Sequence, residues 1–113
     1  MKRRMLFMFG PLVMGAGAFG VTQPGELSTR ELETLLKTMH TQKDHLRLAA
    51  HFEALAKRYE SEAAEHAARA KLYKVGPKPS GAAMHCEYLS ESLGKASKEA
   101  RAMAEEHKDM AKK

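Results

Sequence analysis

A seven-residue spacing governs the apolar and small side chains between residues 45 and 73. One row holds His45, Phe52, Tyr59, His66 and Tyr73, and an alanine follows four residues after each of its first four members. A sustained seven-residue period is typical of helices that wind around one another in a left-handed coiled coil. Small residues along one row let two such helices approach closely. The pattern therefore predicts one long, Ala-rich helix through this region.

The same scheme returns after the stretch "KVGPKPSG". Gly76, Pro77 and Pro79 cannot continue a helix, and Ser80 can cap the next one. Three parallel rows then follow, each with its members seven apart: Cys86, Leu93, Ala100, His107; Ser90, Ser97, Ala104, Ala111; and Leu89, Ala96, Met103, Met110. The two halves form an internal repeat of one helix each. A short turn at 76–80 makes the two helices antiparallel neighbours.

A shorter apolar stripe precedes the repeat. Ser28 and Glu31 fit a capping box, and the stripe that follows contains Leu32, Leu35, Leu36 and Met39. This stripe is out of phase with the later heptads, and Thr41 with Asp44 can cap a second helix. Both an unbroken helix and a break near Thr41 fit this pattern. We expect an all-α antiparallel helical hairpin, completed to a bundle by dimerisation or by a folded-back N-terminal helix.

The N-terminus has the layout of an export signal. "MKRR" is basic, "MLFMFGPLVM" is apolar, and "GAGAFG" supplies small residues for cleavage. We assign residues 1–20 to a signal peptide, with a short membrane anchor as the alternative, 21–27 to a linker and 28–113 to the hairpin domain. The protein is then exported to the periplasm or the extracellular space. Membrane contact is expected only through an uncleaved leader.

Charge argues against a nucleic-acid partner. The formal net charge is +5, but three of the basic residues are Lys2, Arg3 and Arg4 in the leader. The remaining charges alternate in sign, as in "AKRYESEAAEHAARAK", which is typical of a solvated helix surface and not of a basic binding face. We also expect no enzymatic activity, because a two-helix scaffold offers no concavity for a substrate.

Candidate metal ligands recur at both ends of the predicted helix seam. Antiparallel pairing places His66 opposite Cys86, with His85 adjacent, and His45 opposite His107, with Met110 one turn away. Thiolate, imidazole and thioether groups favour copper or zinc. The alternative is that these histidines are polar seam residues and the methionines fill the core. His40 and His51 lie off the seam and are expected to be solvated.

The sequence thus predicts a non-enzymatic structural or interaction module that self-associates, as a homodimer or another homo-oligomer. The alternative is a periplasmic soft-metal binding protein that uses the histidines, Cys86 and Met110 at the ends of the seam.

Overall fold

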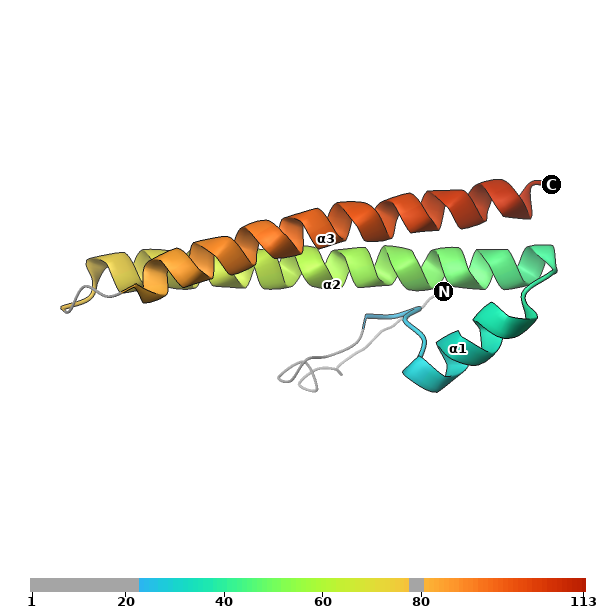
Figure 1. The fold of residues 1–113 in the computed structure, drawn as a ribbon, viewed down its shortest axis with the longest axis horizontal. Coiled ribbons are helices and arrows are strands. Elements are labelled where there is room, and N and C mark those ends of the chain that lie inside the picture. The colour runs from blue at the N-terminus through green and yellow to red at the C-terminus, as the bar shows by residue number, and fades with distance from the viewer. Residues whose placement is uncertain (1–22, 78–80) are drawn as a thin grey trace, which may run out of the picture.

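The computed structural model describes residues 23–77 and 81–113, and the predicted leader lies outside the described residues. These residues form helices α1 (Thr29–Thr38), α2 (Gln42–Val75) and α3 (Ala82–Ala111). Figure 1 shows α2 and α3 running antiparallel along their whole length, with α1 folded back beside the first half of α2. The all-α antiparallel hairpin is confirmed. In the described part of the chain, no helix is long and apolar enough to span a bilayer.

Local sequence devices set the start of each of the first two helices. The Ser28 hydroxyl accepts from the Glu31 backbone N–H, and the Glu31 carboxylate accepts from the Ser28 backbone N–H. Thr41 and Asp44 form the same reciprocal box at the start of α2. A capping box satisfies backbone N–H groups that lack partners in the first turn. The chain therefore breaks after Thr38, as one of the two sequence alternatives predicted.

Glycines flank the turn between α2 and α3. Gly76 ends α2, and Gly81 is the N-cap of α3, where no side chain accepts a capping hydrogen bond. Ser80, expected to cap this helix, lies outside the described residues. Before α1, Gly25 has a φ of 92°, and the Glu26 N–H donates to the Gln23 carbonyl at 2.9 Å. Pro24 followed by a positive-φ glycine is the usual type II turn, which directs the chain along α2.

The seam between α2 and α3 consists of the two heptad rows of each helix. Ala49, Phe52, Ala56 and Ala70 are buried on α2. On α3 the buried residues are Ala83, Cys86, Ser97, Ala100, Ala104, His107 and Ala111, and with the half-buried Ser90 and Leu93 they recur at alternating spacings of three and four. That spacing is the a/d pattern of a coiled coil. The third row of α3 behaves differently, because Leu89, Met103 and Met110 remain substantially exposed. A helix with one neighbour buries two rows and leaves a third open.

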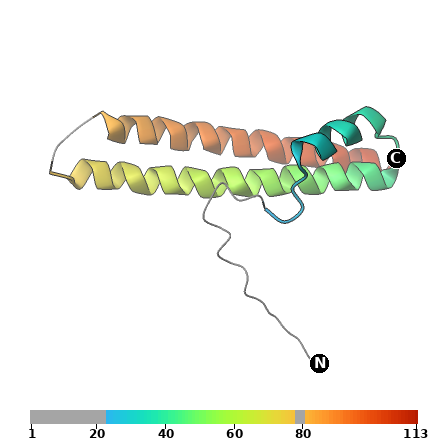
Figure 2. The ribbon, with the colours of Figure 1, turned by 90° about the horizontal axis from the view of Figure 1, so that it is seen from below.

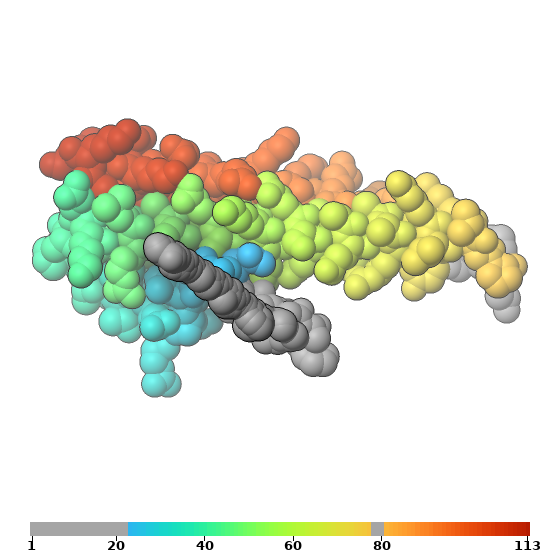
Figure 3. Space-filling model, turned by 180° about the vertical axis from the view of Figure 1, so that it is seen from behind, coloured from blue at the N-terminus to red at the C-terminus, as the bar shows by residue number. Residues whose placement is uncertain are grey.

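Helix α1 closes one end of this seam. Its Leu35 joins Leu48, Phe52 and Ala104 in a hydrophobic core cluster, with Leu27, Leu32 and Leu55 packed against it. Figure 2 shows α1 at the end of the hairpin where α2 begins and α3 ends. In the space-filling view of Figure 3, α2 extends well beyond α1 toward the turn. The hairpin therefore has a three-helix base and a two-helix tip.

Candidate functional site

Two histidines meet at the base of the hairpin. His45 Nδ1 and His107 Nδ1 are 3.1 Å apart, and the rings stack with centroids separated by 5.3 Å. This hydrogen bond requires one ring to donate a proton from Nδ1 and the other to accept it on a lone pair. The juxtaposition predicted from the heptad rows is confirmed for this pair.

The surroundings of His107 favour its neutral form. Burial is the main cause that lowers the pKa of His107, and the neighbouring His45 lowers this pKa further. Phe52 stacks on the other side of His107, with ring centroids 5.9 Å apart and planes nearly parallel. Desolvation and a like-charged neighbour both disfavour an imidazolium ion. His107 is therefore held as a neutral ring between an aromatic side chain and a second imidazole.

Met110 lies beside this pair. His45 and Met110 both line an open recess of about 310 Å³ at the base, together with His40, Thr41, Gln42 and the C-terminal Ala111, Lys112 and Lys113. His40 is solvated, as expected, and its Nδ1 lies 2.7 Å from the Thr38 carbonyl oxygen. His45 therefore belongs to both features, because it pairs with His107 and lines the recess that Met110 also lines.

The other predicted group is less complete. Cys86 is buried and free, whereas His85, its neighbour in sequence, is exposed. Successive residues of a helix point about 100° apart, so only Cys86 faces α2. Across the seam, His66 Nδ1 is buried and has no hydrogen-bond partner within residues 23–77 and 81–113. The structure therefore places one imidazole nitrogen without a partner in this half of the seam and turns His85 away.

The prediction that His51 is solvated was wrong. His51 is only 4 % exposed, and its Nδ1 accepts the Leu27 backbone N–H at 2.9 Å. Its ring also meets Phe52 edge-on. The segment before α1 covers this face of α2, and burial lowers the pKa of His51. A further stripe on α2, in which Leu48, His51 and Leu55 lie three or four residues apart, is the sequence signal that could have revealed this burial.

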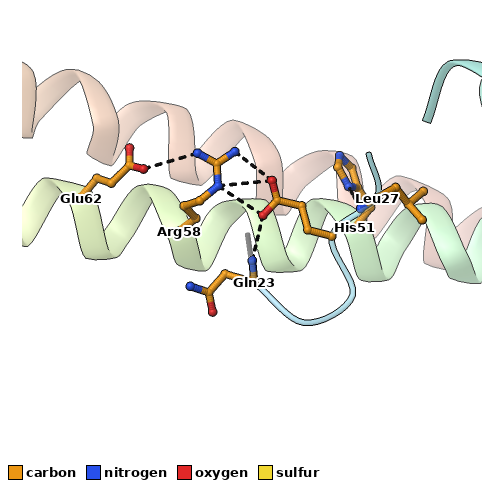
Figure 4. Close-up of polar contacts among 6 residues, drawn as sticks. Gln23, Leu27, His51, Arg58 and Glu62 are labelled. Carbon is orange, nitrogen blue, oxygen red and sulfur yellow. Dashed lines mark hydrogen bonds and ion pairs between the residues drawn. The ribbon is translucent and has the colours of Figure 1, made fainter. Parts of the chain in front are cut away.

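An ion pair fixes the same segment (Figure 4). The Arg58 guanidinium donates from Nε to both oxygens of Glu26 at 3.2 Å and from Nη2 at 2.9 Å. Burial would raise the pKa of Glu26, but the hydrogen bonds from Arg58 and from the Gln23 backbone leave it below its usual value. Arg58 also contacts Glu62 one turn further along α2. Residues 23–27, expected to be a linker, therefore dock on α2.

The metal-ligating side chains occur in small sets. Across residues 23–77 and 81–113, no group of three or more His, Cys, Asp or Glu side chains is arranged to hold a metal ion. At the base, two imidazoles pair and one of them shares a recess with Met110, and toward the tip one buried thiol shares the seam with one imidazole. Sets of two or three soft donors match the low coordination numbers of Cu(I) better than the four ligands of a structural zinc site.

No protein-family model, no curated protein and no solved structure matches the chain.

Proposed function

We propose that the protein is a small, exported, non-enzymatic helical module that acts in structure or interaction by self-association. Its partner is a second copy of the chain, which packs along one side of the α2–α3 hairpin. The export part of this proposal rests on the basic and apolar leader in the sequence. The self-association part rests on a difference between the two sides of the hairpin.

One side of the seam is closed by charged pairs. Three ion pairs bridge α2 and α3 along it, between Glu53 and Lys108 at 2.6 Å, Glu60 and Arg101 at 2.7 Å, and Lys74 and Glu87 at 2.6 Å. Such exposed pairs add little stability, but they set which side of a helix pair faces water. This side is complete within one chain.

The opposite side, which we call the open side, is apolar on α3. On α2 the same side carries Leu48 and Leu55, which pack against α1, followed by Glu62 and Arg69. On α3 it carries the third row: Leu89, Ala96, Met103 and Met110. Met103 is 44 % exposed and Leu89 is 48 % exposed. The row spans 21 residues, or roughly 30 Å of helix. An apolar row of this length beside a seam is what each helix of a four-helix bundle buries against its second neighbour.

A second copy of the chain is better suited to cover this apolar row than helix α1 of the same chain. Helix α1 has 10 residues against 30 in α3, and it packs chiefly on Leu48 and Phe52 of α2 at the base. It leaves Met103 and Met110 exposed. Two copies related by a twofold axis present the same row to each other, so one apolar surface covers both. The open side is the single observation that carries the proposal.

A charged residue on the open side tests the proposal. We expect Met103→Glu to shift the chain from two copies to one in light scattering coupled to gel filtration, because a buried carboxylate without a partner is strongly unfavourable. Ala102→Glu is the matched control, since Ala102 is exposed on the neighbouring face of the same helix turn. It should leave the mass unchanged. Equal masses for the two variants would contradict the proposed interface.

A second candidate function is soft-metal binding, with copper or zinc as the ion. The observation that favours it is the buried His66 Nδ1 without a hydrogen-bond partner in the described chain, in the same seam as the free thiol of Cys86. A buried nitrogen without a partner costs free energy, and a metal ion would satisfy it. His45, His107 and Met110 would supply a second site at the base.

Metal titration tests this candidate. Binding to the folded chain alone raises the melting temperature by mass action. We expect Cu(I), added under reducing and anaerobic conditions, to raise it, and Cys86→Ser and His66→Ala each to remove most of that rise. His85→Ala is the matched control because His85 is exposed and faces away from the seam. An unchanged melting temperature with both Cu(I) and Zn(II) would refute metal binding.

A further inference from the structure

Large apolar side chains gather at the turn end of the hairpin. We call five of them the tip patch: Leu72, Tyr73 and Val75 at the end of α2, and Met84 and Tyr88 at the start of α3. Val75 is 80 % exposed, Leu72 68 % and Tyr88 57 %. Exposed apolar residues scattered singly are common on soluble proteins, whereas these five lie close to the same end of two neighbouring helices, and a gathering of exposed apolar side chains points to an interaction site.

Tyr73 continues a seam row, whereas the other members of the tip patch face outward. Leu72 lies two residues after the buried Ala70, and Met84 and Tyr88 lie two residues before and after the buried Cys86. Two residues along a helix correspond to a rotation of about 200°. These side chains therefore point almost directly away from the seam. A second helix pair packed on one side would cover only part of the patch, whereas an apolar medium that surrounds the tip would cover all of it.

The tip is also the basic part of the described chain. Residues 69–77 and 81–89 contain three basic residues, Arg69, Lys71 and Lys74, and one acid, Glu87. Arg69 pairs with Glu65 at 3.9 Å and Lys74 with Glu87 at 2.6 Å, but both pairs are about half exposed, and such pairs are weak enough to give way to a phosphate. The rest of the described chain has twelve basic and thirteen acidic residues. Arg69 borders an open recess of about 380 Å³ whose other walls are Leu72, Tyr73, Gly76 and Pro77. A guanidinium beside an apolar recess matches a phosphate headgroup above acyl chains.

We propose that the tip of the hairpin docks on an anionic lipid surface. Leu72, Val75 and Met84 enter the boundary between headgroups and acyl chains, and Tyr88 lies at headgroup level, where tyrosine is favoured. The basic side chains bind the negative surface. This docking needs no membrane-spanning helix, and it rests on residues other than those of the open side.

A tryptophan reporter tests the proposal in the full chain. The sequence contains no tryptophan, so Tyr88→Trp places a single reporter on the tip. Leu46→Trp is the matched control, since Leu46 is half exposed at the base of the same hairpin. We expect vesicles of phosphatidylglycerol and phosphatidylcholine to shift the emission of the Tyr88→Trp variant to the blue, and brominated lipid to quench it. The Leu46→Trp variant should show neither effect.

Two further experiments separate the electrostatic contribution to lipid binding from the apolar contribution. High salt or vesicles of phosphatidylcholine alone should weaken binding several-fold, because both remove the attraction of the basic residues. Adding Leu72→Ser and Val75→Ser to the Tyr88→Trp variant should weaken binding by about tenfold or more, because less apolar surface is buried. Both positions are exposed, so we expect these variants to fold. An unchanged helical circular dichroism spectrum would verify this.

Three results would overturn the proposal. Equal quenching of the two reporters would mean that the leader or the whole surface binds lipid. Absence of quenching in both would leave the tip patch to a protein partner. Unchanged binding of the double serine variant would show that the tip patch does not carry the contact.

Discussion

Truncation of Leu48 gives a stringent test of how the base of the hairpin is held together. Within residues 23–77 and 81–113, Leu48 is the largest side chain that is completely buried, and it belongs to the core cluster with Leu35, Phe52 and Ala104. Leu48→Ala removes apolar contact with all three helices at once. Leucine-to-alanine changes in protein cores cost about 2 to 5 kcal/mol, and the cost depends on how far the surroundings can collapse.

The structure indicates the lower half of that range. Leu35 is the only buried residue of α1, so this helix is held by few contacts and can move into the space that Leu48 leaves. We therefore expect a loss of about 2 to 3 kcal/mol in the free energy of unfolding. For a chain of this size, that loss corresponds to a urea midpoint lower by about 1 to 2 M.

Leu46→Ala is the matched control for this measurement. Leu46 lies on the same helix two residues earlier and is half exposed, so the change in helix propensity is the same and the loss of burial is much smaller. Unfolding in urea, followed by circular dichroism at one protein concentration, compares the two variants. Midpoints that fall equally would refute the placement of Leu48 in the core.

Two other predictions follow from the seam and from the docked N-terminal segment. Ala56 is fully buried between α2 and α3, so Ala56→Leu should destabilise the fold by about 1 to 3 kcal/mol in the same urea assay, whereas the exposed Ala68→Leu should be nearly neutral. Burial lowers the pKa of His51 from 6.5, so below pH 6.5 the unfolded chain binds more protons than the folded chain. The free energy of unfolding should therefore be constant above about pH 7 and fall from pH 6.5 toward the folded pKa. His51→Asn keeps an acceptor for the Leu27 N–H without titrating, and should reduce the fall. His40→Asn should not, and equal falls in both variants would contradict this role of His51.

Much of the fold could be predicted because its signals are local. The Ser28 and Thr41 caps involve partners three residues away, and the heptad rows depend only on spacing along one helix. The break after Thr38 followed from the same local chemistry, although the sequence alone also fitted an unbroken helix. The pairing of His45 with His107 followed from the rows once the turn fixed the two helices as antiparallel.

The burial of His51 was not predictable in the same way. Its partner, Leu27, lies 24 residues earlier in the chain, and the contact depends on the path of residues 23–27 across α2. The Glu26–Arg58 pair, which holds that path, spans 32 residues. A heptad pattern describes only the faces that two helices share. It therefore contains no information on a connecting segment that docks on a third face.

The exposure of the third row of α3 could also not be predicted from the sequence. Met103 and Met110 share the heptad spacing of the buried rows, so the sequence could not show that one chain leaves them exposed. Which rows are buried depends on the number of neighbours around a helix, and α3 packs mainly against α2. The exposure of Met103 is the fact from which the proposed self-association follows.

Sedimentation equilibrium of the chain is the most direct test of that central claim. The chain is measured at several concentrations, beginning at Val21 so that the apolar leader does not contribute to association. We predict a mass of twice one chain at the higher concentrations, with dissociation to one chain on dilution. The mass of a single chain at every concentration would contradict the claim that the open side binds a second copy.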